Sequence, residues 1–198
     1  MSELTRTTTL LLEGLLDPNN REAWRTLHDR CRPMLMAYGR RRGLQDADAE
    51  DAAQEALADF ARAYQAGQYE RERGPLRHWL AGFAARRVAK VGSARRAPGL
   101  DHPDKTQVLA GAADTDSGSL DQVWEEEWER HVLQMCLSQV RMEADPKHVE
   151  AFEMYALGGC SVAETAQAVG VSENVVYIAK TRILSRLRAL REELEALW

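Results

Sequence analysis

The stretch "CSVAETAQAVGVSENVVYIAKTRILSRLR", residues 160–188, contains two helical patterns separated by a single glycine. Ser161 can cap the first helix, and Glu164 stands three residues later, as a capping box requires. Gly170 allows the left-handed backbone conformation of a tight turn, and Ser172 offers the cap of the next helix. The stretch therefore predicts two helices joined by a short turn.

The second of these helices has one apolar face. We expect the first helix over about 162–169 and the second over about 172–190. Apolar residues of the second helix recur at three- and four-residue spacing, at Val175, Val176, Ala179, Ile183, Leu187 and Leu190. This layout is typical of a helix-turn-helix, whose second helix contacts base edges in the major groove of DNA. An ordinary helical hairpin with a solvated charged face is the alternative.

The net charge of -5 is unfavourable for a protein that binds nucleic acid, because phosphate contacts require Lys and Arg. The charges are segregated, however. Residues 1–100 carry 17 Lys and Arg against 13 Asp and Glu, residues 101–145 carry 3 against 11, and residues 146–198 carry 6 against 7. Residues 180–191 hold five basic side chains and no acid. Because local fields rather than the total charge attract DNA, the negative sum does not exclude DNA binding.

A change of composition in the middle of the chain indicates a domain boundary. Residues 93–119 are rich in Pro, Gly, Asp and Ser and lack a helical period. They predict a flexible acidic linker of roughly 25 residues, for which the role of a mere spacer is the alternative. We therefore expect an N-terminal helical domain at 1–92, a linker at 93–120 and a C-terminal helix-turn-helix domain at 121–198.

The remaining segments have the apolar spacing of helices. Helical patterns cover about 20–43, 46–67, 74–96 and 122–137, and none of them alternates with the period of two that a strand requires. Pro33 lies inside the first of them and predicts a kink or a break. The predicted fold class is all-α, with two small helical domains joined by a flexible acidic linker.

The order of these elements resembles that of the extracytoplasmic-function (ECF) sigma factors, the two-domain sigma subunits of bacterial RNA polymerase. The resemblance lies in an acidic helix "DAEDAAQEALADFARA", a loop "YERERGPLRHWL" that leads into a basic helix, a linker, and a C-terminal helix-turn-helix that contains "VYIAKTRILSRLR". It covers residues 20–92 and 125–191. It implies a first domain that binds the clamp of core RNA polymerase and melts the minus-ten promoter element, and a second that reads the minus-thirty-five element. The implied partners are core RNA polymerase, promoter DNA, and an anti-sigma factor or other regulator.

The candidate residues for the upstream promoter element lie on the polar side of the second helix. In a helix-turn-helix, side chains near the start of that helix contact base edges, and flanking polar and basic groups contact phosphates. The base-reading set is Asn174, Tyr177 and Lys180, and the phosphate-contacting set is Ser172, Arg182 and Arg186, with Thr181 on the same side.

Aromatic and basic residues are interleaved around the loop that precedes the helix at 74–96. This mixture suits unstacked bases that are held on aromatic faces beside a charged backbone. The candidate set for the minus-ten region is Tyr69, Arg71, Arg73, Arg77, His78, Trp79, Arg86, Arg87 and Lys90. A core position is the alternative for Trp79.

The acidic helix has a stripe of carboxylates. Asp48, Asp51 and Glu55 are spaced three and four residues apart, beside Gln54, and can pair with arginines on a partner helix. With the resemblance, these four residues are the candidate contacts to core polymerase. A solvated charged face is the alternative, and a two-metal site is not supported because no Glu-x-x-His pair accompanies the acids.

Other functional classes have little support in the sequence. No Ser/His/Asp set, Gly-rich phosphate loop or His/Cys cluster is present, so we expect no enzyme activity, catalytic residue, metal or cofactor. The three cysteines lie far apart and are interpreted as reduced thiols. No run of about 18 apolar residues occurs, so we expect a cytoplasmic protein without membrane insertion. The remaining alternatives are a helix-turn-helix regulator and a protein-binding adaptor, neither of which binds core polymerase.

Overall fold

The computed structural model describes residues 3–17, 19–96 and 122–198. Within these ranges the chain forms helices and turns and no strand, which confirms the predicted all-helical class. The contacts among residues divide the chain into two units. We call Thr7–Glu129 with Leu197–Trp198 the N-terminal unit, and Arg130–Ala196 with Met1–Arg6 the C-terminal unit.

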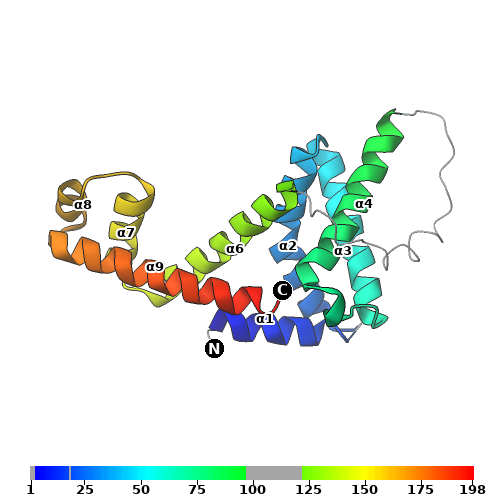
Figure 1. Cartoon of the computed structure of the whole chain (residues 1–198), viewed down its shortest axis with the longest axis horizontal. Helices are drawn as coiled ribbons and strands as arrows, with labels where there is room; N and C mark the ends of the chain where they lie inside the picture. Colours follow the sequence, from blue (N-terminus) through cyan, green and yellow to red (C-terminus); the bar gives the residue numbers. More distant parts are fainter. Residues whose placement is uncertain (1–2, 18, 97–121) are drawn as a thin grey trace. The chain divides into compact units, whose positions relative to one another are not determined.

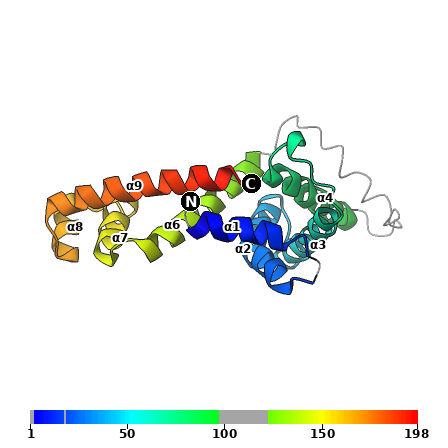
Figure 2. The ribbon, with the colours of Figure 1, turned by 90° about the horizontal axis from the view of Figure 1, so that it is seen from below.

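The N-terminal unit is built around three long helices. These are α2 (Arg21–Arg41), α3 (Asp46–Gln65) and α4 (Leu76–Arg96), which run side by side in Figures 1 and 2. Helix α1 (Glu3–Gly14) precedes them, and the short η1 (Arg71–Arg73) lies in the loop before α4. Their apolar faces form one core, whose largest fully buried side chains include Leu15, Leu27, Tyr38, Phe60, Leu76 and Leu80.

Two details of this unit differ from the sequence-based expectation. We expected a kink or a break at Pro33; helix α2 continues through this residue to Arg41 without a break, and Pro33 is exposed. Helix α4 extends to Arg96 and takes up the first residues of the expected linker. It ends shortly before Pro98, which disfavours a helical conformation at the preceding residue. The rest of the expected linker, 97–120, lies outside the described residues.

Helix α6 (Gln122–Glu143) contributes to both units. Its first turns, up to Glu129, belong to the N-terminal unit, although we expected a C-terminal domain from residue 121 onward. Trp124 accounts for this assignment, because its buried ring meets the ring of Tyr38 on α2 edge to face, with centroids 5.5 Å apart. Two aromatic side chains of α6 thus decide where its first half packs: Trp124 and Trp128.

The C-terminal unit contains the rest of α6 and four further elements. These are α7 (Pro146–Phe152), the π-helical turn η3 (Glu153–Leu157), α8 (Val162–Val169) and α9 (Glu173–Glu195). Helices α7 and α8 lie against the first half of α9 in both views (Figures 1 and 2). Small buried side chains allow this close approach, because Ala151, Ala166 and Ala179 form the core together with Val169 and Val176.

The turn between α8 and α9 has the predicted geometry. Ser161 and Glu164 form a complete capping box at the start of α8. Gly170 ends α8 with φ 70° and ψ 44°, the left-handed conformation that glycine adopts without a steric cost. Helix α9 then begins after Ser172, as expected, but it extends to Glu195 rather than ending near residue 190. The expected helix at 162–169 is confirmed residue for residue.

None of the helices within the described ranges is both long enough and apolar enough to cross a membrane.

Candidate nucleic-acid interface

Helix α9 presents one polar, exposed face along most of its length. Val176, Ala179 and Ile183 on the opposite side are buried in the core of the C-terminal unit. Asn174, Thr181 and Arg188 follow one another at intervals of seven residues, which is close to two helical turns, and all three are exposed. Tyr177, Arg182 and Ser185 are exposed beside them. The face therefore offers amide, hydroxyl, phenol and guanidinium groups to a ligand.

Ser172 stands at the N-terminus of this face. Its backbone is extended and its carbonyl accepts the first hydrogen bonds of α9, from the amides of Val175 and Val176. Its hydroxyl makes no capping hydrogen bond and the residue is exposed. The position of the cap is as predicted, and the exposed hydroxyl is accessible to solvent. The N-terminus of a helix favours anions such as phosphate.

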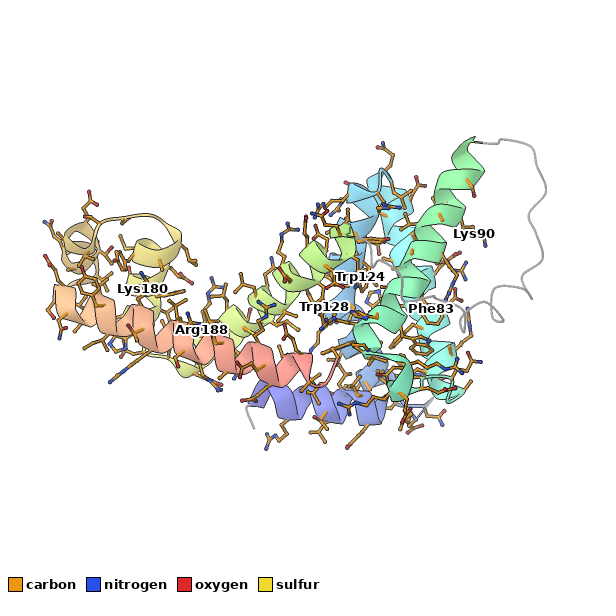
Figure 3. The ribbon with its side chains drawn as sticks, in the orientation of Figure 1. Phe83, Lys90, Trp124, Trp128, Lys180 and Arg188 are labelled. Atoms are coloured by element: carbon orange, nitrogen blue, oxygen red, sulfur yellow. The ribbon has the colours of Figure 1, made fainter. Side chains whose placement is uncertain are left out.

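Lys180 lies at the edge of the exposed face, not at its centre. Its ammonium stands over the ring of Tyr155, with Nζ 5.0 Å from the ring centroid. Figure 3 shows Lys180 on the side of α9 that faces α7. The ring of Tyr155 also meets that of Tyr177 edge to face, with centroids 5.9 Å apart. The structure thus brings together two predicted base-reading residues, Tyr177 and Lys180, around a third residue that the sequence did not single out.

Arg186 is engaged inside the C-terminal unit. Its Nε donates to Oε2 of Glu143 at 2.7 Å, and its Nη2 donates to Oε1 at 2.9 Å. Gln139 donates to the same carboxylate at 2.6 Å. The bond from Arg186 holds the pKa of Glu143 below its ordinary value, and the carboxylate in turn raises the pKa of Arg186. Arg186, a predicted phosphate contact, therefore joins α9 to α6 through this ion pair.

Arg182 and Arg188 are the exposed arginines of this helix that form no ion pair within the described residues. Sequence analysis selected Arg182 but passed over Arg188, which is labelled in Figure 3. The spacing from Asn174 and Thr181 was the signal that would have identified Arg188.

The aromatic residues proposed for the minus-ten region belong to one cluster in the N-terminal unit. Trp79 is half-buried and lies 5.2 Å from Phe60, 5.5 Å from Tyr69 and 5.0 Å from Phe83, measured between ring centroids. The hydroxyl of Tyr69 donates to the carbonyl of Gly74 at 3.1 Å, and burial raises the pKa of Tyr69. Tyr69 and Trp79 thus have a packing role, and each keeps a partly exposed surface.

The basic residues near this cluster differ in their surroundings. Arg71 and Arg73 are exposed on η1, and Arg73 pairs with Glu70 at 2.7 Å. The backbone amide of Arg77, in the first turn of α4, donates to the carbonyl of Trp198 at 2.8 Å. His78 is partly buried, and its Nε2 lies 3.6 Å from Oε1 of Glu125. These residues surround the start of α4.

The basic residues farther along α4, Arg86, Arg87 and Lys90, also differ in how exposed they are. Arg87 forms ion pairs with Asp59 and Glu55 of α3, and only 11% of its side chain is exposed. Arg87 thus joins α4 to α3, and little of its side chain is accessible to a ligand. Arg86 is half-buried with its guanidinium 4.6 Å from the ring centroid of Phe83, and burial lowers its pKa. Lys90 is exposed near the far end of α4 (Figure 3).

The acidic stripe on α3 is partly occupied by contacts within the chain. Glu55 pairs with Arg87, and Gln54 donates to Glu50 at 2.8 Å. Asp48 is half-buried. Asp51 is exposed and forms no ion pair within the described residues. Of the four candidate polymerase contacts, Asp51 is the carboxylate that the fold leaves open.

No metal centre accompanies these surfaces in the part of the chain that the structure describes, where no three His, Cys, Asp or Glu side chains are grouped to hold an ion. Cys31 and Cys136 are buried thiols, and burial raises their pKa values to about 12 and about 11. Comparison of the chain with protein-family models, with curated proteins and with solved structures yields no match.

Proposed function

We propose that this protein is a sigma subunit of bacterial RNA polymerase, of the ECF type. It would direct core polymerase to specific promoters and assist the melting of promoter DNA. The observation that carries the proposal is the exposed face of α9, which begins at Ser172 directly after the left-handed turn at Gly170. A polar helix face at this place in a helix-turn-helix suits the major groove.

The surroundings of each side chain refine the roles on α9. Asn174, Tyr177 and Thr181 are exposed near the start of the helix and are assigned to base edges. Ser172, Arg182 and Arg188 are assigned to phosphates. Lys180 remains a base-reading residue whose side chain extends along Tyr155. Arg186 is left out, because Glu143 already neutralises it.

In the N-terminal unit, single-stranded minus-ten DNA is the proposed ligand. Tyr69 and Trp79 are partly exposed aromatic residues, on whose rings unstacked bases can lie. Arg71, Arg73 and Lys90 are exposed cations for the phosphate backbone; Arg73 is kept because both members of its ion pair with Glu70 are exposed. Asp51 is the proposed contact to core polymerase. Core polymerase and promoter DNA are then the partners, with an anti-sigma factor or other regulator, and the cytoplasm is the place of action.

A DNA-binding regulator that acts without core polymerase is the second candidate. The observation that favours it is the ion pair between Glu55 and Arg87, which removes one carboxylate from the expected polymerase contact. An adaptor that uses the face of α9 to bind a protein is the third.

Transcription with purified components tests the proposal. Core polymerase is incubated with fragmented genomic DNA, with and without the full chain, and the 5′ ends of the transcripts are mapped. The proposal predicts new start sites that require the chain and have a common upstream motif. Start sites that are unchanged by the chain would favour the regulator or the adaptor.

A further inference from the structure

Tyr155 lies in the middle of the π-helical turn η3, directly after α7. The amide of Gly158 donates to the carbonyl of Glu153, five residues earlier, at 2.7 Å. A side chain at position 158 would place its Cβ 2.9 Å from the carbonyl oxygen of Met154, so glycine is needed for this closure. The π-helix occurs mostly as single turns within α-helices, and these turns are frequent at functional sites. The turn holds the ring of Tyr155 against α9.

Tyr155 makes one contact that any apolar core residue could make and one that requires an aromatic ring. Tyr155 is partly buried and packs against the small core of the C-terminal unit. The face of its ring carries the ammonium of Lys180, at 5.0 Å from the centroid. A cation at this distance from an aromatic face is attracted by the ring quadrupole. An aliphatic side chain at position 155 would fill the same space without this attraction.

A solvent-exposed lysine side chain samples many rotamers. Fixing it in one rotamer when a ligand binds costs conformational entropy. A contact with Tyr155 restricts Lys180 before DNA arrives, and preorganisation of this kind improves binding by lowering the ordering cost. Tyr177 is fixed by the same ring, through an edge-to-face contact at 5.9 Å. One residue outside α9 therefore orders two neighbouring residues on it.

We propose that Tyr155 is a positioning residue that sets base preference by holding Lys180, and with it Tyr177, at the edge of the α9 face. This inference rests on the proposed function, because it requires that Lys180 reads DNA. Tyr155 itself need not touch a base. Its effect on preference must then pass through Lys180, and this dependence separates the proposal from a purely structural role.

The test is a double-mutant cycle on base preference. The full chain is bound, alone and with core polymerase, to a library in which the upstream element is randomised. The variants are Tyr155→Leu, Tyr155→Phe, Lys180→Ala and the combination of Tyr155→Leu with Lys180→Ala. Thermal unfolding of each variant shows whether it remains folded, and Tyr155→Phe keeps the ring if the leucine variant does not fold.

We expect Tyr155→Leu to relax the preference by about two- to five-fold, at the base positions that Lys180→Ala also relaxes. Tyr155→Phe should keep the preference, and Tyr155→Leu should have no further effect once Lys180 is absent. Three results would each overturn the inference. Tyr155→Leu could have the same effect with and without Lys180, Tyr155→Phe could lose the base preference, or Tyr155→Leu could leave the base preference unchanged. If the unmodified chain selects no sequence with or without core polymerase, the proposed function fails as well.

Discussion

Three arginines of α9 show how one residue type takes different roles on one helix. Arg182 and Arg188 are exposed, whereas Arg186 makes a two-pronged ion pair with Glu143. We predict that Arg182→Ala weakens binding to all DNA sequences and lowers the slope of log affinity against log salt by about one unit, because one phosphate contact is lost. Arg188→Ala should act in the same way. Titrations at several salt concentrations measure both effects.

Arg186→Ala serves as the matched comparison within the same helix. It should leave the salt slope unchanged and lower the melting temperature, because it leaves the carboxylate of Glu143 without its main partner. If Arg186→Ala reduced the slope as much as Arg182→Ala, Arg186 would contact phosphate after all. The assignment of roles by ion pairing would then be wrong.

At the residue scale, the sequence predicted the burial of a side chain correctly where the periodicity of its own helix determines that burial. The period of α9 correctly placed Val176, Ala179 and Ile183 in the core. It did not reveal the ion pairs of Arg186 and Arg87, because their partners come from other helices and no local pattern reveals which carboxylate a long side chain will reach. The same reason explains why Tyr155 was missed.

At the scale of elements, α3 and α4 are joined by a largely buried cluster of charges. Asp59 accepts from Arg62 and Arg87, and 6% of its side chain is exposed. We predict that Arg87→Met lowers the free energy of unfolding by about 1–3 kcal/mol, because the buried carboxylate of Asp59 then keeps only the largely exposed Arg62 as a partner. Chemical denaturation followed by tryptophan fluorescence measures the change.

The double variant Asp59→Leu with Arg87→Met tests the cause. Replacing both charges by apolar side chains of similar size should restore most of the lost stability, since no buried charge remains. A double variant that is less stable than Arg87→Met alone would mean that the ion pair contributes more than its desolvation costs.

His78 of α4, which lies near Glu125 of α6, should make the free energy of unfolding depend on pH. Burial, and then the neighbouring charge of Arg77, hold the pKa of His78 below 6.5, while Glu125 opposes them. The unfolded chain thus binds a proton at His78 more readily than the folded chain does. Stability should be complete above pH 6.5 and fall as the pH drops through 6.5 toward the lowered pKa. His78→Gln should flatten this part of the curve in denaturation experiments from pH 8 to 5; an unchanged slope would contradict the assignment.

The elements themselves were largely predictable from the sequence. The capping box at Ser161 and the left-handed turn at Gly170 are local signals, and they fixed α8 without error. The π-helical turn η3 was not foreseen, because its closure depends on Gly158 fitting against a carbonyl rather than on any apolar period. The assignment of the first turns of α6 to the N-terminal unit depends on where Trp124 is buried, which only tertiary packing decides.

At the scale of the whole molecule, the negative net charge is compatible with a protein that binds both DNA and a large protein partner. We predict that Asp51→Asn weakens binding to core polymerase by about two- to five-fold, the range of a surface ion pair. Glu22→Gln, an exposed acid at the start of α2, is the matched control and should leave the affinity unchanged. Pull-down or titration with purified core polymerase measures the difference. Equal affinities of the unmodified chain, Asp51→Asn and Glu22→Gln would show that Asp51 does not contact core polymerase.

The central claim is that the exposed face of α9 touches upstream promoter DNA when the chain is bound to core polymerase. The most direct measurement is photo-crosslinking from the position of Ser185, which is exposed on this face and has no assigned contact. The proposed function predicts a crosslink to upstream DNA that requires core polymerase and disappears when the upstream element is scrambled. A crosslink only to protein would contradict the claim, and an equally strong crosslink to DNA without core polymerase would replace the sigma factor with a regulator.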